Sequence, residues 1–340
     1  MRGRRPCFTP ALISLLVLAC LPEASEEIWH VRFTHVYPTS SDYQLMAERI
    51  RDLMDRRTDG RFRVVIYPSG QLGGERMAFE QLQAGATHMA VSGTPVLSGW
   101  VPEGQIFDLP FAFETRDEGL QVLDGPLGDW WREKFLESTG VRSLGFLDYG
   151  FRHVYNSKRP IHEPSDLVGL KLRVLQNATY LSAYAALGVQ ATPMSYGEVY
   201  SALQQGVIDG GEANVIGFVT DRFSEVGRYF SFTAITYNPI TLLVNDRFYR
   251  SLPQDVQRSL DRSVAEALAY QSEVARELER EGIAEMESSG VVVSHPSLDA
   301  FEPIVRPRVW EELASRLEGG DELLERLRQE TERVRKVNMN

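Results

Sequence analysis

One arginine stands out by its position between residues 169 and 214, a segment whose pattern predicts strand, helix, strand, helix and strand. In the sequence LKLRV, Leu170, Leu172 and Val174 share one face of a strand, and Arg173 lies on the other face near its C-terminal end. In α/β folds this end of a strand opens onto the crevice where ligands bind. A guanidinium matches a carboxylate with two parallel hydrogen bonds, so Arg173 is a candidate anchor for an acid in a solvent-filled cleft. The alternative is a surface arginine paired with a neighbouring Asp or Glu.

Motifs of enzymatic chemistry are absent from the sequence. It contains no G-x-S-x-G, no P-loop and no G-x-G-x-x-G that opens a helix. The histidines that follow residue 25 do not form a pair at metal-ligand spacing, and no two carboxylates are singled out as an acid/base couple. We therefore expect no catalytic residue, no bound metal and no cofactor.

Length and charge limit the classes of partner. The chain has 340 residues, of which 43% are hydrophobic and 24% charged, and this is enough for two domains of ordinary size. Its net charge of −11 argues against nucleic acid and anionic membranes as partners. An anionic ligand stays open, because a small cleft can be locally positive on an acidic protein.

Residues 1–25 have the features of an export signal. Basic residues begin the chain, and the apolar run from Ala11 to Ala19 is too short to span a bilayer. The segment from Val17 to Cys20 resembles a lipoprotein signal box, in which Cys20 would carry the lipid; an ordinary cleaved signal peptide is the alternative. Both cysteines lie in this signal, so no disulfide or cysteine-metal site is expected in the folded body.

Strands and helices alternate after the signal. Such alternation predicts an α/β fold with mainly parallel sheets. A long helix is predicted from Pro253 to Ser288 and a charged helical tail from Pro303 to Val337. Ser195 and Glu198 have the spacing of a capping box, S-x-x-E.

Seven sequence blocks stand out along the chain. They are YPSGQLGGER (67–76), FDLPFAF (107–113), GFRHVYNSKRPI (150–161), GLKLR (169–173), ALG with PM (186–194), EVY-x-ALQ-x-G (198–206) and DGGE (209–212). Together they resemble the substrate-binding proteins of tripartite ATP-independent periplasmic (TRAP) transporters, of the DctP type. They follow one another in that family's order, and the resemblance covers nearly the whole chain.

The resemblance implies a two-lobed periplasmic binding protein (Venus-flytrap) fold with a long connecting helix. Residues 27–149 plus 238–277 are expected in lobe I, and residues 150–237 plus 278–340 in lobe II. The ligand is expected between the lobes, which close on it about a hinge.

Site residues follow from the same resemblance, each with an alternative from the residues themselves. Arg173 and Arg152 correspond to the family's two arginines that contact the ligand acid, although Arg152 could instead pair with Asp148 or Glu212. Tyr196 corresponds to an aromatic residue over the ligand, or it is a core aromatic residue.

Further polar residues match cleft positions of the family. Glu75 and His35 correspond to contacts with ligand hydroxyls, although Glu75 could instead serve the dipole of a helix. Gln176 and Asn177 could add hydrogen bonds or cap the next helix. Tyr237 lies where the chain returns to lobe I.

One departure concerns the strand end that the family writes as DG-x-E-N. Here Ala213 stands at the asparagine position, and the asparagine is the next residue, Asn214. Neighbouring residues point in different directions, so Asn214 is a candidate ligand contact with an open outcome.

The implied function is extracytoplasmic capture of a small organic acid and its delivery to the small and large membrane subunits of a TRAP permease. A sugar acid is favoured and a C4-dicarboxylate comes next. The resemblance implies a periplasmic location, and we expect a monomer. Two alternatives are a ligand-sensing partner of a membrane receptor and a secreted α/β enzyme.

Overall fold

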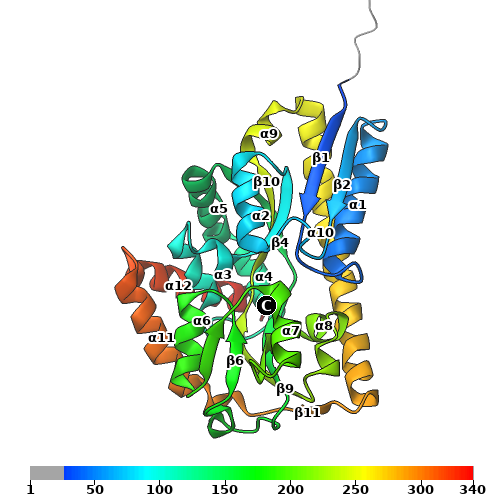
Figure 1. Ribbon diagram of the computed structural model, residues 1–340. Helices are drawn as coiled ribbons and strands as arrows, with labels where there is room; N and C mark the ends of the chain where they lie inside the picture. The colour runs from blue at the N-terminus through cyan, green and yellow to red at the C-terminus, as the bar shows by residue number, and fades with distance from the viewer. Residues whose placement is uncertain (1–26, 340) are drawn as a thin grey trace, which may run out of the picture.

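The computed structural model describes residues 27–339, and the predicted signal with Cys20 lies outside the described residues. Two sheets stand one above the other in Figure 1. The first has the strand order β2-β1-β3-β10-β4, and β10 alone runs antiparallel to its neighbours. Its strands are β1 (Trp29–Thr34), β2 (Phe62–Tyr67), β3 (Met89–Gly93), β4 (Val141–Leu147) and β10 (Ile240–Asn245).

Helices cover both faces of this sheet. The first of them begins where Ser41 accepts a hydrogen bond from the backbone of Gln44, and it buries an apolar stripe that includes Met46 and Ile50 against the sheet. The helices of this lobe are α1 (Asp42–Arg57), α2 (Glu75–Ala84), α3 (Thr94–Leu97), the 3-10 helix η1 (Pro102–Asp108), α4 (Arg116–Leu123), α5 (Pro126–Thr139) and α9 (Asp246–Ser251).

The second sheet has the order β11-β9-β5-β8-β6-β7, and within it only β5 runs against its neighbours. The prediction of mainly parallel sheets is therefore confirmed for both. The strands are β5 (Phe151–Asn156), β6 (Lys171–Val174), β7 (Gln190–Pro193), β8 (Gly210–Ala213), β9 (Tyr229–Tyr237) and β11 (Val292–Ser294). The helices of this lobe that concern the site are α6 (Ala178–Ala186), α7 (Val199–Gln204) and α8 (Val215–Thr220), and the short 3-10 helices η2 (Pro164–Leu167) and η4 (Phe223–Glu225) complete it.

A helix of 35 residues, α10 (Gln254–Ser288), connects the two lobes. It packs against α1 and β4 at one end and against α8 and β11 at the other, and Figure 1 shows it along one edge of both sheets. The chain also crosses between the lobes after β4 and after β9, where the amide of Asn238 donates to the carbonyl of Gly150 at 3.2 Å. These paired crossings and the predicted long helix give the two-lobed architecture.

Two C-terminal helices close the opposite edge. The first, α11 (Glu302–Arg316), follows the 3-10 turn η5 (Leu298–Ala300) and packs against α6 of the second lobe. The second, α12 (Gly320–Asn338), packs against α4 and α5 of the first lobe, and Arg335 pairs with Glu118 across this contact. The packing of α12 favours its assignment to lobe I, whereas the sequence boundaries expected it in lobe II; the division at those boundaries stays a prediction.

The predicted capping box at Ser195 is wrong. The segment Tyr196–Glu198 is a 3-10 turn, η3, and the Ser195 side chain accepts no capping hydrogen bond. Tyr196 is fixed instead by ring contacts with Tyr37 and Phe223. These tertiary contacts decide the local geometry, and α7 therefore begins only at Val199.

Candidate functional site: a polar cleft between the lobes

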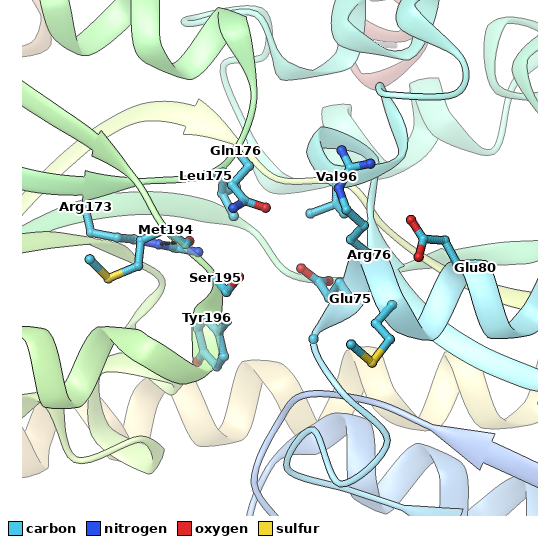
Figure 2. A pocket seen from close by; sticks show the side chains of 12 residues that line it. Glu75, Arg76, Glu80, Val96, Arg173, Leu175, Gln176, Met194, Ser195 and Tyr196 are labelled. Atoms are coloured by element: carbon cyan, nitrogen blue, oxygen red, sulfur yellow. Dashed lines mark hydrogen bonds between the residues drawn. The ribbon is translucent and has the colours of Figure 1, made fainter.

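A cavity of about 320 Å³ lies between the two lobes. Figure 2 shows side chains of α2 and Val96 on one side, facing Arg173, Gln176 and the segment from Met194 to Tyr196 on the other. Every wall residue of the second lobe comes from the end of a strand or the loop that follows it, namely β6 and β7. The cleft therefore lies at the carboxyl ends of parallel strands, as expected for an α/β fold.

Arg173 sits in β6 with Leu172 and Val174 buried on the other face of the strand. Its Nε atom donates to the carbonyl of Met194 at 3.0 Å, and its guanidinium lies 5.9 Å from the Tyr196 ring centroid. The residue borders the cavity but is only 3% exposed, so the expectation that it faces an open, solvent-filled cleft is wrong for this structure. Burial, followed by the nearby Arg152, lowers the pKa of Arg173. A buried cation of this kind favours an anionic partner.

Arg152 lies in β5 and is also buried. It forms an ion pair with Glu212 and donates from Nη1 to the hydroxyl of Tyr149 at 2.6 Å. Its predicted alternative, a pair with Glu212, is thus present. It also borders a void of about 10 Å³ that Glu75 and Tyr196 line as well. Arg152 can therefore serve both the structural pair and a ligand.

One carboxylate stands between the two arginines. Glu212, at the end of β8, pairs with Arg152 and has an oxygen 4.0 Å from Nη1 of Arg173. All three side chains are at most 3% exposed. Two buried guanidiniums thus share one counter-charge, which leaves room for the negative charge of a bound acid.

Glu75 faces this pair from the first lobe, as the first residue of α2. Its carboxylate accepts from the amide of Gly93 at 3.0 Å. Burial raises the pKa of Glu75, while the Gly93 hydrogen bond and the two arginines act to lower it. A raised pKa favours the neutral carboxyl, which repels an acid less than a carboxylate does and can donate a hydrogen bond to a ligand oxygen.

Asn177 does not line the cavity, whereas its neighbour Gln176 does. Asn177 is the N-cap of α6, where its oxygen accepts from the amides of Thr179 and Tyr180, so the capping alternative is confirmed. Its Nδ2 atom reaches the first lobe and donates to Asp108 at 3.0 Å and to Ser98 at 3.1 Å. This side chain therefore ties the two lobes together beside the loop that carries Gln176.

Asp108 gives this contact a pH dependence. Burial raises the pKa of Asp108 to about 8 from 3.8, opposed by hydrogen bonds from Thr94 and Asn177. Folding then takes up a proton, so the carboxyl destabilises the folded protein increasingly as pH rises from about 4 to about 8. We expect Asp108→Asn to raise the melting temperature at pH 9 and to change it little at pH 5, because an amide oxygen still accepts from Asn177.

The measurement is thermal unfolding of wild type and Asp108→Asn at both pH values. Asp52→Asn, at an exposed ion pair with Arg51, is the matched control and should show no gain at pH 9. An equal effect of Asp108→Asn at both pH values would contradict the protonated, buried carboxyl.

Comparison with known proteins identifies the family of this chain. The family model described as bacterial extracellular solute-binding protein, family 7 (DctP) matches residues 33–316. The chain belongs to this family.

Individual relatives are similar to this chain over most of their length. The C4-dicarboxylate-binding periplasmic protein DctP of Rhodobacter capsulatus is 30% identical over 322 residues, which cover 94% of this chain and 93% of that protein. The sugar acid binding protein DctPAm from Advenella mimigardefordensis, in complex with galactonate, has a TM-score of 0.85 at 26% identity and covers 91% of this chain and 99% of its own. A TRAP periplasmic solute-binding protein from Chromohalobacter salexigens, with bound D-glucuronate, also reaches 0.85 at 26% identity, covering 88% and 99%. The predicted TRAP resemblance and two-lobed fold are confirmed.

Two of the positions predicted from the family lie away from the cavity. His35 is buried and its Nε2 atom lies 3.0 Å from the side-chain oxygen of Gln44. Tyr237 is buried between the rings of Phe113 and Phe151. Neither residue lines the cavity: Tyr237 is the last residue of β9 and belongs to the hydrophobic core, and the His35 ring contacts Gln44.

Asn214 has a structural partner as well as access to the site. It is the N-cap of α8 and donates from Nδ2 to the carbonyl of Tyr149 at 3.0 Å, across the chain crossing. It borders a further void of about 10 Å³ between the lobes. Sequence reasoning missed two tyrosines that line this region, Tyr37 and Tyr149, since an isolated tyrosine in a loop carries no spacing signal.

Two other kinds of feature were sought in the part of the chain that the structure describes. Within residues 27–339, none of the helices combines the length and the apolar character that crossing a membrane requires. In the same described part, no three His, Cys, Asp or Glu side chains are placed to hold a metal ion together.

Proposed function

We propose that the protein binds a small organic acid, a sugar acid first of all, between its lobes and delivers it to a TRAP permease. The observation that carries this proposal is the buried trio of Arg152, Arg173 and Glu212, in which two cations share one carboxylate beside the cavity. A ligand carboxylate supplies the missing counter-charge. Because each lobe contributes walls to the cavity, such a ligand favours the closed state over the open one.

A sugar acid fits the cavity walls better than a plain hydrocarbon acid. Glu75, Gln176, Ser195 and Tyr196 offer hydrogen-bonding groups around the arginines. The relatives with bound galactonate and D-glucuronate support this class, and the C4-dicarboxylate-binding relative supports the second choice. In the proposed role the protein acts as an exported monomer in the periplasm, with the small and large permease subunits as its partners.

Thermal unfolding over a panel of acids tests the proposal. A ligand present at one hundred times its Kd stabilises the folded state by about 2.7 kcal/mol, which appears as a rise in melting temperature. We expect galactonate or glucuronate to give this rise and the matched sugar alcohol, galactitol, to give none, because it lacks the carboxylate. If galactitol stabilises the protein as much as galactonate does, the arginines do not anchor the ligand through its carboxylate. If succinate gives the largest rise in melting temperature, the ligand class is the C4-dicarboxylates.

A further inference from the structure

Three cavities follow one another between the lobes, and Tyr196 lines all of them. The outer cavity of about 320 Å³ holds Arg173, and the next, of about 10 Å³, is bordered by Arg152. The innermost, also about 10 Å³, lies between the start of α1 and α8. The two small voids share Tyr37, Tyr149 and Tyr196, so the innermost lies next to the void that Arg152 borders.

The innermost void is lined by acceptor groups from both lobes. Asp42 comes from the first turn of α1 and Asp221 from the end of α8. One oxygen of Asp42 accepts from Gln271 of α10 at 2.5 Å, and Asp221 accepts from the hydroxyl of Tyr196. The wall is therefore acidic, in contrast to the two arginines at the other end of the row.

Two residues that line this void each have a polar atom without a hydrogen-bond partner among the described residues. These atoms are Oδ1 of Asp42 and the hydroxyl of Tyr43, in side chains that are 1% and 3% exposed. The Tyr43 ring is held by stacking on Tyr37, with ring centroids 4.0 Å apart, so its hydroxyl has a fixed position. Buried polar atoms without a partner are costly, and their presence at a cavity indicates a group that completes them.

We propose that this void is a subsite for a hydroxyl group on the tail of the bound acid, held by Asp42 and Tyr43. The inference rests on the proposed function and extends it to the part of the ligand farthest from its carboxylate. The void has about the volume of one water molecule, which is also the size of one hydroxyl group. A hydroxyl can donate to the Asp42 oxygen and share a second hydrogen bond with Tyr43.

The same subsite discriminates between ligand classes. A C4-dicarboxylate carries a second negative charge at its far end, and this charge would meet Asp42 and Asp221. Burial raises the pKa of Asp42 to about 6 and that of Asp221 to about 7, so these carboxyls are negatively charged above those values and then repel a second carboxylate. Repulsion of the wrong ligand contributes to specificity as much as attraction of the right one. The subsite therefore selects acids with a neutral, hydroxylated tail.

Tyr43→Phe tests the subsite with the least disturbance of the fold. The hydroxyl has no protein partner, so its removal should leave the melting temperature of the ligand-free protein unchanged. Calorimetric titration with galactonate should show affinity lower by about three- to ten-fold, the loss expected for one hydrogen bond. Lactate, which has the carboxylate without the long tail, should bind both proteins equally.

Tyr184→Phe is the matched control. The Tyr184 hydroxyl is also buried without a partner among the described residues, but it lies in the core of the second lobe and lines none of the three cavities. Its removal should leave galactonate binding unchanged. Equal galactonate affinity in wild type and Tyr43→Phe, or an equal loss for lactate, overturns the subsite. Wild-type protein that binds no acid of the panel overturns the proposed function itself.

Discussion

Replacing Arg173 by alanine is expected to reduce the affinity for the bound acid by about two to three and a half decades. The change leaves the ligand carboxylate desolvated without its partner, at a cost of about 3–5 kcal/mol. Arg173→Lys should also bind much more weakly, because an ammonium cannot form the two parallel hydrogen bonds. Calorimetric titration of wild type and both variants with galactonate measures the loss.

The ligand-free stability of these variants separates an anchor from a structural ion-pair residue. In the absence of ligand, Arg173→Ala removes the hydrogen bond to Met194, worth about 1 kcal/mol, but leaves Glu212 paired with Arg152. A small decrease in melting temperature is therefore expected. Near-native affinity in Arg173→Ala, or a large loss of ligand-free stability, would mean that Arg173 serves the fold and not the ligand.

Glu212→Gln should produce the largest loss of ligand-free stability in the cleft. It keeps the shape of the side chain but leaves Arg152 and Arg173 buried without a counter-charge. Breaking a buried pair in this way costs about 3–5 kcal/mol in the free energy of unfolding. Chemical denaturation monitored by tryptophan fluorescence measures this difference.

Bound acid should restore part of that stability, since its carboxylate takes the place of the missing charge. The stabilisation by galactonate should therefore be larger in Glu212→Gln than in wild type. Glu225→Gln, at the exposed pair with Arg222, is the matched control and should change stability little. A Glu212→Gln protein as stable as this control would show that the two arginines do not depend on the shared carboxylate.

Local patterns predicted the framework of the site well. The alternation in LKLRV placed Arg173 at the end of β6, and the helical spacing after Pro253 gave α10 almost to its ends. Both signals depend only on which residues share a face, and burial of that face decides the structure. The same reasoning failed for Ser195, because ring contacts of Tyr196 with residues distant in sequence override a local cap.

Contacts across the lobes lay beyond sequence reasoning. The sequence pattern predicted that Asn177 either contacts the ligand or caps a helix. No neighbouring residue in the sequence indicated its hydrogen bonds to Ser98 and Asp108. An ion pair with Glu212 was predicted only for Arg152. The approach of Glu212 to Arg173 depends on how β8 lies beside β6, which local sequence does not indicate. No sequence pattern indicated Asp42 and Tyr43, because their proposed role in a ligand subsite depends on the approach of α8 to the start of α1.

The strand order of the first sheet constrains the order in which the chain can fold. The fourth strand of this order, β10, separates β3 from β4 and comes last of the five along the sequence. Until residue 245 leaves the ribosome, β4 has no neighbour in its sheet and the core around it stays open. Domains fold as units, so a nascent chain of this topology remains unfolded until most of it has been synthesised. The pairing of β4 with β10 is therefore a late step, and the first lobe closes only after most of the second lobe's strands have been synthesised.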